Sequence, residues 1–191
     1  LAGSTGAGPF LQKPLPAAAD RELAALIERT PGLPVLAAVG VPVPVNGALY
    51  NCAAVFCGGR LLGLSAKSCV PNYGEFYEAR HFTPAPECVE VSFAGFSVPL
   101  GSSLLYRPEG WEDCAVGVEI CEDLWSPEPP STRLALAGAT LILNLSASDE
   151  VIGKASYRRD LVRGQSGRVL CAYVYADAGG GESTTDLLVC G

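Results

Sequence analysis

Apolar residues follow two spacings along the chain, and each spacing predicts a different kind of element. Leu23, Leu26 and Ile27 recur at helical intervals, so residues 17–29 are predicted as a helix that Pro31-Gly32 ends. Further helices are predicted at 75–82, 133–137 and 155–168, and strands at 34–41, 48–57, 60–66, 89–96, 115–120, 140–145, 169–176 and 186–190. Gly58-Gly59 predicts a hairpin in the first half. Strands and helices alternate in the second half, so the fold class is α/β with a mixed sheet.

The composition narrows the class of protein. With 191 residues, 49% of them hydrophobic and 17% charged, the chain suits one ordered domain. The net charge of −7 disfavours nucleic acid or a membrane surface as a partner, and no apolar run is long enough to span a bilayer. Met is absent, including at position 1, as expected of an interior piece of a longer chain.

The eight cysteines do not form a metal-binding pattern. None belongs to a Cys-x-x-Cys pair, and His81 is the only histidine, so no metal site is predicted. Several cysteines lie inside apolar runs, where a free thiol behaves as a small hydrophobe. This usage predicts a reducing, cytoplasmic environment.

One cysteine stands apart from the others. Cys121 follows an apolar strand directly and precedes the polar turn Glu122-Asp123, which would expose its sulfur beside a backbone N–H suited to an oxyanion. Lys67 closes another strand, and a nearby lysine lowers a thiol pKa and stabilises an oxyanion. Carboxylates follow closely in the segment 73–78. Taken singly, Cys121 could be only part of a turn and Lys67 only a surface charge.

Five ordered segments together resemble one family. They are 49–55 (LYNCAAV), 67–80 (KSCVPNYGEFYEAR), 120–125 (ICEDLW), 137–148 (AGATLILNLSAS), and 173–176 (YVYA) continuing through 181–186 (GESTTD). This order is similar to that of the nitrilase (CN-hydrolase) superfamily, and more closely to the glutaminase domain of glutamine-dependent NAD⁺ synthetases. The resemblance covers nearly the whole chain.

The resemblance implies a fold and a set of roles. The fold would be a four-layer αββα sandwich with mixed sheets, truncated at both ends. Cys121 would attack the side-chain amide of glutamine, Lys67 and the Glu122 N–H would stabilise the oxyanion, and Glu75 would position the lysine. Further residues implied to bind the substrate are Tyr73, Glu122, Trp125, Ser148 and Lys154. The family often has arginine at the last of these positions.

The resemblance also implies what lies outside the chain. The general-base glutamate of the family would fall a few residues before Leu1, so the 191-residue chain alone is expected not to turn over glutamine. Residues 1–191 would be a partial glutaminase domain that carries no cofactor. ATP and Mg²⁺ would belong to the absent synthetase domain, which is an expected partner within a homo-oligomeric parent. A free-standing amidase of the nitrilase superfamily and a non-catalytic assembly module are the alternatives.

Overall fold

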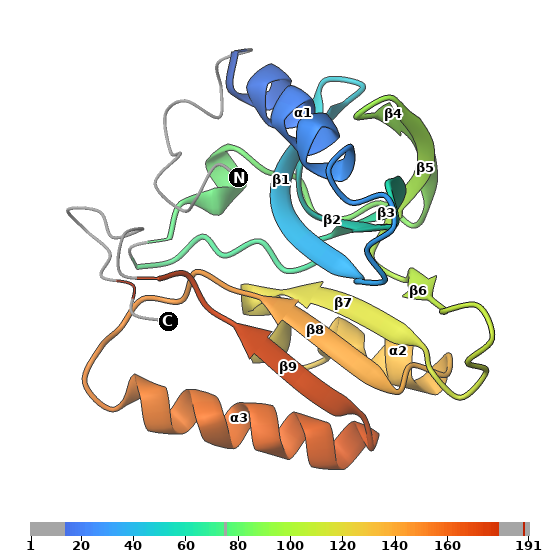
Figure 1. Cartoon of the computed structure of the whole chain (residues 1–191). Helices are drawn as coiled ribbons and strands as arrows, with labels where there is room; N and C mark the ends of the chain where they lie inside the picture. Colours follow the sequence, from blue (N-terminus) through green and yellow to red (C-terminus); the bar gives the residue numbers. More distant parts are fainter. Residues whose placement is uncertain (1–13, 75, 180–188, 190–191) are drawn as a thin grey trace.

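Two mixed β-sheets form the centre of the protein. The computed structural model describes residues 14–74, 76–179 and 189 (Figure 1). Sheet A has the order β1 (Ala37–Val45), β2 (Ala48–Cys57), β3 (Arg60–Ala66), β5 (Phe96–Gly101), β4 (Val89–Phe93), and only its β3–β5 pair is parallel. Sheet B has the order β6 (Leu105–Tyr106), β7 (Val116–Ile120), β8 (Leu141–Leu145), β9 (Ala172–Ala176), with β7, β8 and β9 parallel.

Helices cover the outer face of each sheet. Helix α1 (Pro14–Ile27) lies against sheet A, and α2 (Pro130–Leu136) and α3 (Lys154–Val169) lie on the far side of sheet B (Figure 1). Two 3-10 helices, η3 (Glu78–Arg80) and η4 (Cys121–Trp125), follow strands near the site described below. The arrangement is the four-layer αββα sandwich that the resemblance implied, and the α/β class that the sequence pattern predicted is confirmed.

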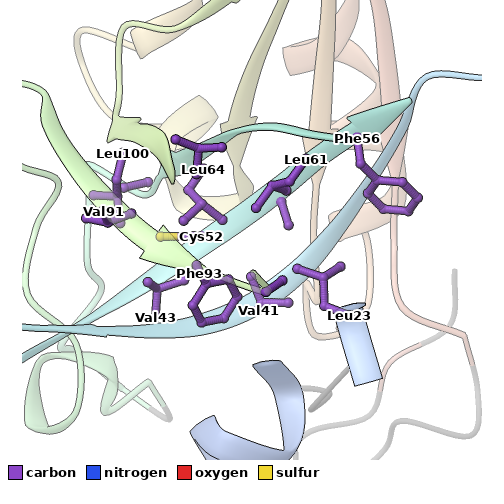
Figure 2. Packing of buried hydrophobic residues seen from close by; sticks show 14 of the residues in the cluster. Leu23, Val41, Val43, Cys52, Phe56, Leu61, Leu64, Val91, Phe93 and Leu100 are labelled. Carbon is purple, nitrogen blue, oxygen red and sulfur yellow. The ribbon is translucent and has the colours of Figure 1, made fainter. Parts of the chain in front are cut away.

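Side-chain alternation on the central strands explains the layers. On β2, Cys52, Ala54 and Phe56 join the cluster under α1, whereas Ala53 and Val55 face sheet B. Both faces of this strand are therefore buried. Figure 2 shows the outer cluster, in which Leu23 of α1 lies among side chains of the sheet A strands.

The outer face of sheet B packs very closely on α2. A Cβ atom added to Gly117 of β7 would lie 3.0 Å from Leu134 Cδ1 and 3.1 Å from Ile142 Cδ1. Glycine at this position lets α2 approach the sheet, which brings the first turn of α2 within hydrogen-bond distance of the strand.

Most predicted elements are present, with different bounds at several positions. Strands β2 and β3 have the predicted ends, and Gly58 and Gly59 both have positive φ angles in the hairpin between them. The strand predicted at 34–41 instead runs from Ala37 to Val45 and includes Pro42 and Pro44. Prolines lack a donor, but β1 is an edge strand and tolerates them.

Two other predictions were wrong in part. Residues 89–96 are not one strand, because Ala94 (φ 50°) and Gly95 (φ 80°) turn the chain from β4 into β5. The helix predicted at 75–82 is only the short η3, with residue 75 outside the described part. The strand predicted at 186–190 lies outside the described residues apart from Val189, which forms a bridge with Asp149.

The parallel strands of sheet B define the place of the site. Ile120, Leu145 and Ala176 are the last residues of β7, β8 and β9, and they lie side by side in the sheet register. Ligands of parallel sheets bind beyond this carboxyl edge. Cys121 follows the first of these strand ends directly.

Candidate functional site

Cys121 occupies a strained turn. It joins β7 to η4 with a φ of 48°, a left-handed conformation that costs an L-residue roughly 1–2 kcal/mol. Its N–H donates to Asn144 Oδ1 at 3.2 Å, and the N–H of Ile120 donates to Asp123 Oδ2 at 2.9 Å. Strain of this kind is common where a reactive side chain must be presented in one orientation. The structure thus places the cysteine at a strand end, where the sequence pattern put it.

Lys67 follows β3 and is buried, with only 3% of its surface exposed. Its N–H donates to the carbonyl of Asn51 at 2.8 Å, which continues the pairing of β2 and β3 by one residue. The ammonium forms an ion pair with Glu78 Oε2, and Glu78 Oε1 accepts the amide of Asn51 at 3.0 Å. A buried lysine is therefore held in place by a partly buried carboxylate.

Glu78, which lies in the acidic segment 73–78, is the carboxylate that the described structure brings to Lys67. Glu75, to which the resemblance assigns this positioning role, lies outside the described residues, and its role stays a prediction. Sequence spacing did not distinguish the two, because both follow Lys67 closely in the segment 73–78.

The charges of Lys67 and Cys121 act on each other. Burial disfavours the charge of Lys67, but attraction to Cys121 and Glu78 outweighs it and raises the pKa of the ammonium. Burial raises the pKa of the Cys121 thiol, while Lys67 and the Ala147 N–H act in the opposite direction. Lys67 lowers the thiol pKa as expected, but burial outweighs its effect. The raised pKa keeps Lys67 a cation, and the net shift of the Cys121 thiol pKa is upward because burial has the larger effect.

Asp123 joins the segments of these two residues. Its Oδ1 accepts the N–H groups of Ser68 at 3.0 Å and Cys69 at 2.7 Å, while Oδ2 holds the turn at Ile120. Its side chain is almost completely buried, and burial raises its pKa to about 6, against the opposing effect of these hydrogen bonds. One carboxylate therefore connects the end of β3 in sheet A with the end of β7 in sheet B.

A pocket of about 300 Å³ opens beside Cys121. All five residues implied to bind the substrate line it together with the cysteine. The lining residues are Tyr73, Phe76, Cys121, Glu122, Trp125, Ser148, Asp149, Val151 and Lys154. Residues separated by up to 81 positions along the chain, from Tyr73 to Lys154, thus meet at one cavity.

Opposite charges line this pocket. The hydroxyl of Tyr73 donates to Glu122 Oε1 at 2.7 Å. Lys154 pairs with the buried carboxylate of Asp149, and its ammonium lies 5.4 Å from the ring centroid of Trp125 and 5.8 Å from that of Phe76. Aromatic faces stabilise a nearby cation. The pocket therefore offers a carboxylate and an ammonium to one small ligand.

The wall that carries Ser148 is fixed from behind. The backbone N–H of Ser148 donates to Asp177 Oδ1 at 2.8 Å, and Asp177 in turn forms an ion pair with Arg158 of α3 at 3.2 Å. Arg158 also contacts Glu150 at 3.2 Å. These ion pairs attach the loop after β8 to both β9 and α3.

Several site residues had no role in the sequence-based prediction. They are Asn51, Phe76, Glu78, Asp123, Asn144 and Asp149. All except Phe76 are polar groups that contact another residue near the site. For Asn51, Glu78, Asp123 and Asn144, the fold brings together segments that are well separated along the chain.

Within residues 14–74, 76–179 and 189, no group of three or more His, Cys, Asp or Glu side chains could hold a metal ion. No helix in the described part of the chain is both long and apolar enough to cross a membrane.

Comparison with known proteins identifies relatives over most of the chain. The glutamine-dependent NAD(+) synthetase of Mycobacterium tuberculosis is 45% identical over 174 residues, which is 91% of this chain and 26% of that protein. The human protein of the same name is 34% identical over 151 residues, 73% of this chain and 21% of its own length. The chain thus spans about a quarter of the length of these relatives. No protein-family model matches it.

Solved structures agree with this assignment. A glutamine-dependent NAD(+) synthetase from Cytophaga hutchinsonii superposes with a TM-score of 0.83 and 32% identity, over 97% of this chain and 30% of that one. A CN-hydrolase superfamily protein from Xanthomonas campestris shares the fold, with a TM-score of 0.51 and 15% identity over 87% of this chain and 73% of its own. The chain is therefore homologous, over most of its length, to one part of the glutamine-dependent NAD(+) synthetases, and it has a CN-hydrolase-like fold.

Proposed function

We propose that this chain hydrolyses the side-chain amide of glutamine and supplies the ammonia to a synthetase part of a longer parent. The observation that carries the proposal is the pocket itself. Cys121 lies in one cavity with Glu122 and Lys154, which have opposite charges. A free amino acid has an ammonium and a carboxylate on one carbon, and these two side chains match them.

The proposed reaction uses Cys121 as the nucleophile. Its sulfur forms a bond with the amide carbon of glutamine, and the carbonyl oxygen becomes an oxyanion facing Lys67 and the N–H of Glu122. When the tetrahedral species collapses, the C–N bond breaks and ammonia leaves with the proton taken from the thiol. Water then hydrolyses the thioester, which releases glutamate and restores the thiol.

The proton transfers need a base, and neither Glu78 nor Lys67 is suited to that role. Both oxygens of Glu78 are engaged, one by Lys67 and one by Asn51, which suits a positioning role. Lys67 is a fixed cation because its pKa is raised. The resemblance assigns the base to a glutamate before Leu1, and we propose that this residue transfers the proton.

In the substrate pocket, Glu122 binds the α-ammonium of glutamine, and Lys154 and Ser148 bind its α-carboxylate. Tyr73 and Trp125 are pocket walls in this proposal. Asp149 neutralises Lys154 when the pocket is empty and keeps the ammonium between its aromatic neighbours. Such pairing preorganises the cation for a carboxylate.

We extend the proposal to the parent protein. Its synthetase part would use ATP and Mg²⁺ to amidate deamido-NAD⁺ with the released ammonia, in a homo-oligomer. A reducing, cytoplasmic location suits the seven cysteines of the described segments, all of which are free thiols.

The test compares two amides and one variant in the full-length protein that carries this chain. Ammonia release from glutamine should far exceed release from a simple aliphatic amide, and Cys121→Ala should abolish it. Cys114→Ala is the matched control, since this half-buried cysteine lies outside the pocket. NAD⁺ synthesis from added ammonia should persist in Cys121→Ala.

Each alternative has its own outcome. Equal use of aliphatic amides would indicate a general amidase of the nitrilase superfamily. Absence of amide hydrolysis, with no faster alkylation of Cys121 than of Cys114 by a glutamine-like electrophile, would indicate a non-catalytic assembly module.

A further inference from the structure

A chain of hydrogen bonds runs behind the nucleophile, on the helix-facing side of sheet B. The Ser131 N–H donates to Glu119 Oε2 at 2.7 Å, and the Tyr173 hydroxyl donates to Glu119 Oε1. Asn144 Nδ2 donates to the Tyr173 oxygen at 3.0 Å, and Asn144 Oδ1 accepts the N–H of Cys121 at 3.2 Å. The chain thus begins at α2, crosses β7, β9 and β8, and ends at the backbone of the nucleophile.

Glu119 and Asn144, the two central members of this chain, are almost inaccessible to water, with exposures of 2% and 1%. A buried polar group left without a partner is costly, so each hydrogen bond in the chain constrains the next. Neither residue lines the pocket. Their role must therefore pass through the residues they hold.

The direction of the chain follows from the chemistry of its members. The carboxylate of Glu119 accepts two hydrogen bonds, so the Tyr173 hydroxyl must use its proton on that side. Burial and the charge of Glu119 raise the pKa of Tyr173, which keeps this proton in place. The Tyr173 oxygen then accepts from the amide nitrogen of Asn144. The amide oxygen must consequently face Cys121.

This orientation matters at the strained turn. Asn144 Oδ1 accepts both the N–H of Cys121 and the hydroxyl of Ser146, the latter at 2.7 Å. If the amide were reversed, its NH₂ group would meet the Cys121 N–H, and two donors would face each other. The left-handed conformation of Cys121 would then lose the bond that offsets its strain.

We propose that Glu119, Tyr173 and Asn144 are positioning residues that fix the backbone of the nucleophilic turn at Cys121. The proposal rests on the proposed function, in which Cys121 is the nucleophile. It adds that a buried carboxylate on the helix-facing side of the sheet determines which atom of Asn144 faces the turn.

The sharpest test reverses the direction of the hydrogen bonds along this series. In Glu119→Gln, one amide group cannot accept from both Ser131 and Tyr173, so a donor meets a donor at α2 or, after reversal of the chain, at Cys121. In Asn144→Asp, two carboxylates compete for the single proton of Tyr173. Each single variant should reduce kcat for glutamine about tenfold or more, the effect of losing one hydrogen bond, with KM nearly unchanged.

The double variant Glu119→Gln/Asn144→Asp should recover most of the lost kcat. In it the introduced amide accepts from Ser131 through its oxygen and donates to Tyr173 through its nitrogen. The tyrosine then donates to the introduced carboxylate, whose other oxygen still accepts from Cys121. The negative charge has moved next to the thiol. The pH dependence of Cys121 alkylation by iodoacetamide should therefore shift to higher pH in the double variant.

A pair of tyrosine variants provides a milder test with a matched control. Tyr173→Phe should lower kcat about tenfold, since it disconnects Asn144 from Glu119. Tyr106→Phe also removes one buried hydroxyl, which is hydrogen-bonded to Ser65 at 3.0 Å between the sheets, and should leave kcat unchanged.

The outcomes separate this proposal from the proposed function. Folded single variants with wild-type kcat, or a double variant no better than Asn144→Asp, would overturn the positioning role while leaving glutamine hydrolysis established. If the wild type hydrolyses no glutamine, the proposed function fails. The alkylation profile then tests the hydrogen-bond chain by itself: a profile of the double variant that is indistinguishable from that of the wild type would refute the positioning role.

Discussion

The carboxylate of Asp123 accepts the backbone N–H of Cys69 at 2.7 Å, although the two residues follow strands of different sheets. Cys69 lies two positions after Lys67, and Asp123 two positions after Cys121. The separation of the fixed cation and the thiol is thus determined by a short connection through one buried side chain. Replacing Asp123 should therefore change how the stability of the protein depends on pH and also the geometry of the site.

Asp123 should make the stability of the protein depend on pH in a defined window. Its pKa is about 6 in the folded state against 3.8 for an ordinary aspartate, so the folded state binds the proton more tightly. Between pH 3.8 and about 6 the folded state therefore holds more protons than the unfolded state, and the free energy of unfolding should fall as pH rises. Relative to Asp123→Asn, the decrease should be about 3 kcal/mol at most.

Urea unfolding of the wild type and Asp123→Asn across this window measures the difference. Glu112→Gln, which alters an exposed carboxyl that does not line the pocket, serves as the control. A stability difference that is flat or increases with pH would show that burial of Asp123 does not favour its protonated form.

Lys67→Arg should reduce glutamine hydrolysis by roughly 10² to 10³, the usual effect of losing one oxyanion donor. Arginine keeps the charge, but its planar fork does not fit the position that a compact ammonium occupies beside Glu78. Arg60→Lys, the reverse exchange at the exposed start of β3, is the control and should have no effect. Steady-state ammonia release provides the measurement, and near-normal turnover in Lys67→Arg would remove Lys67 from the proposed mechanism.

The close packing of α2 on β7 leads to a prediction about stability. Gly117→Ala should destabilise the protein by about 1–3 kcal/mol, because its methyl group would press on Leu134 and Ile142. Gly40→Ala on β1 is the matched control, since a Cβ there has nothing within 4 Å. Denaturant midpoints of the two variants give the comparison, and equal midpoints would mean that α2 moves without cost.

The sequence predicted the layers and the strand ends better than the contacts between them. Strands β2 and β3 have strong hydrophobic patterns and a Gly-Gly turn, so their bounds were predicted as observed. The turn at Ala94-Gly95 has only one glycine and was missed, because nothing local distinguishes it from a continuous strand.

In the site, too, some residues could be predicted from the sequence and others could not. Cys121 and the five residues assigned to the substrate by resemblance all line one pocket, so their proximity could be predicted. Asp123 and Asn144 could not, because their roles depend on which backbone N–H a neighbouring strand brings to them. The role of Glu75 and the general base before Leu1 stay predictions.

Lys154 leads to the last prediction, which concerns selectivity. The proposed contact between its ammonium and the α-carboxylate of glutamine is a charge-assisted hydrogen bond, worth roughly 10- to 100-fold in affinity. Lys154→Met should therefore raise KM for glutamine by about that factor and reduce kcat much less. The loss should be specific to substrates with a carboxylate, since a simple aliphatic amide makes no such contact.

The control for this variant lies on the same helix. Arg163 also belongs to α3, but its side chain is 79% exposed and pairs only loosely with Asp160 at 3.9 Å. Like Lys154→Met, Arg163→Met removes one positive charge from α3, but it does not alter the pocket, so KM should stay unchanged. The ratio of kcat/KM values for glutamine and an aliphatic amide is the quantity to compare. If Lys154→Met lowers both values equally, the lysine supports the pocket wall through Asp149 and the aromatic rings, and carboxylate recognition must come from elsewhere.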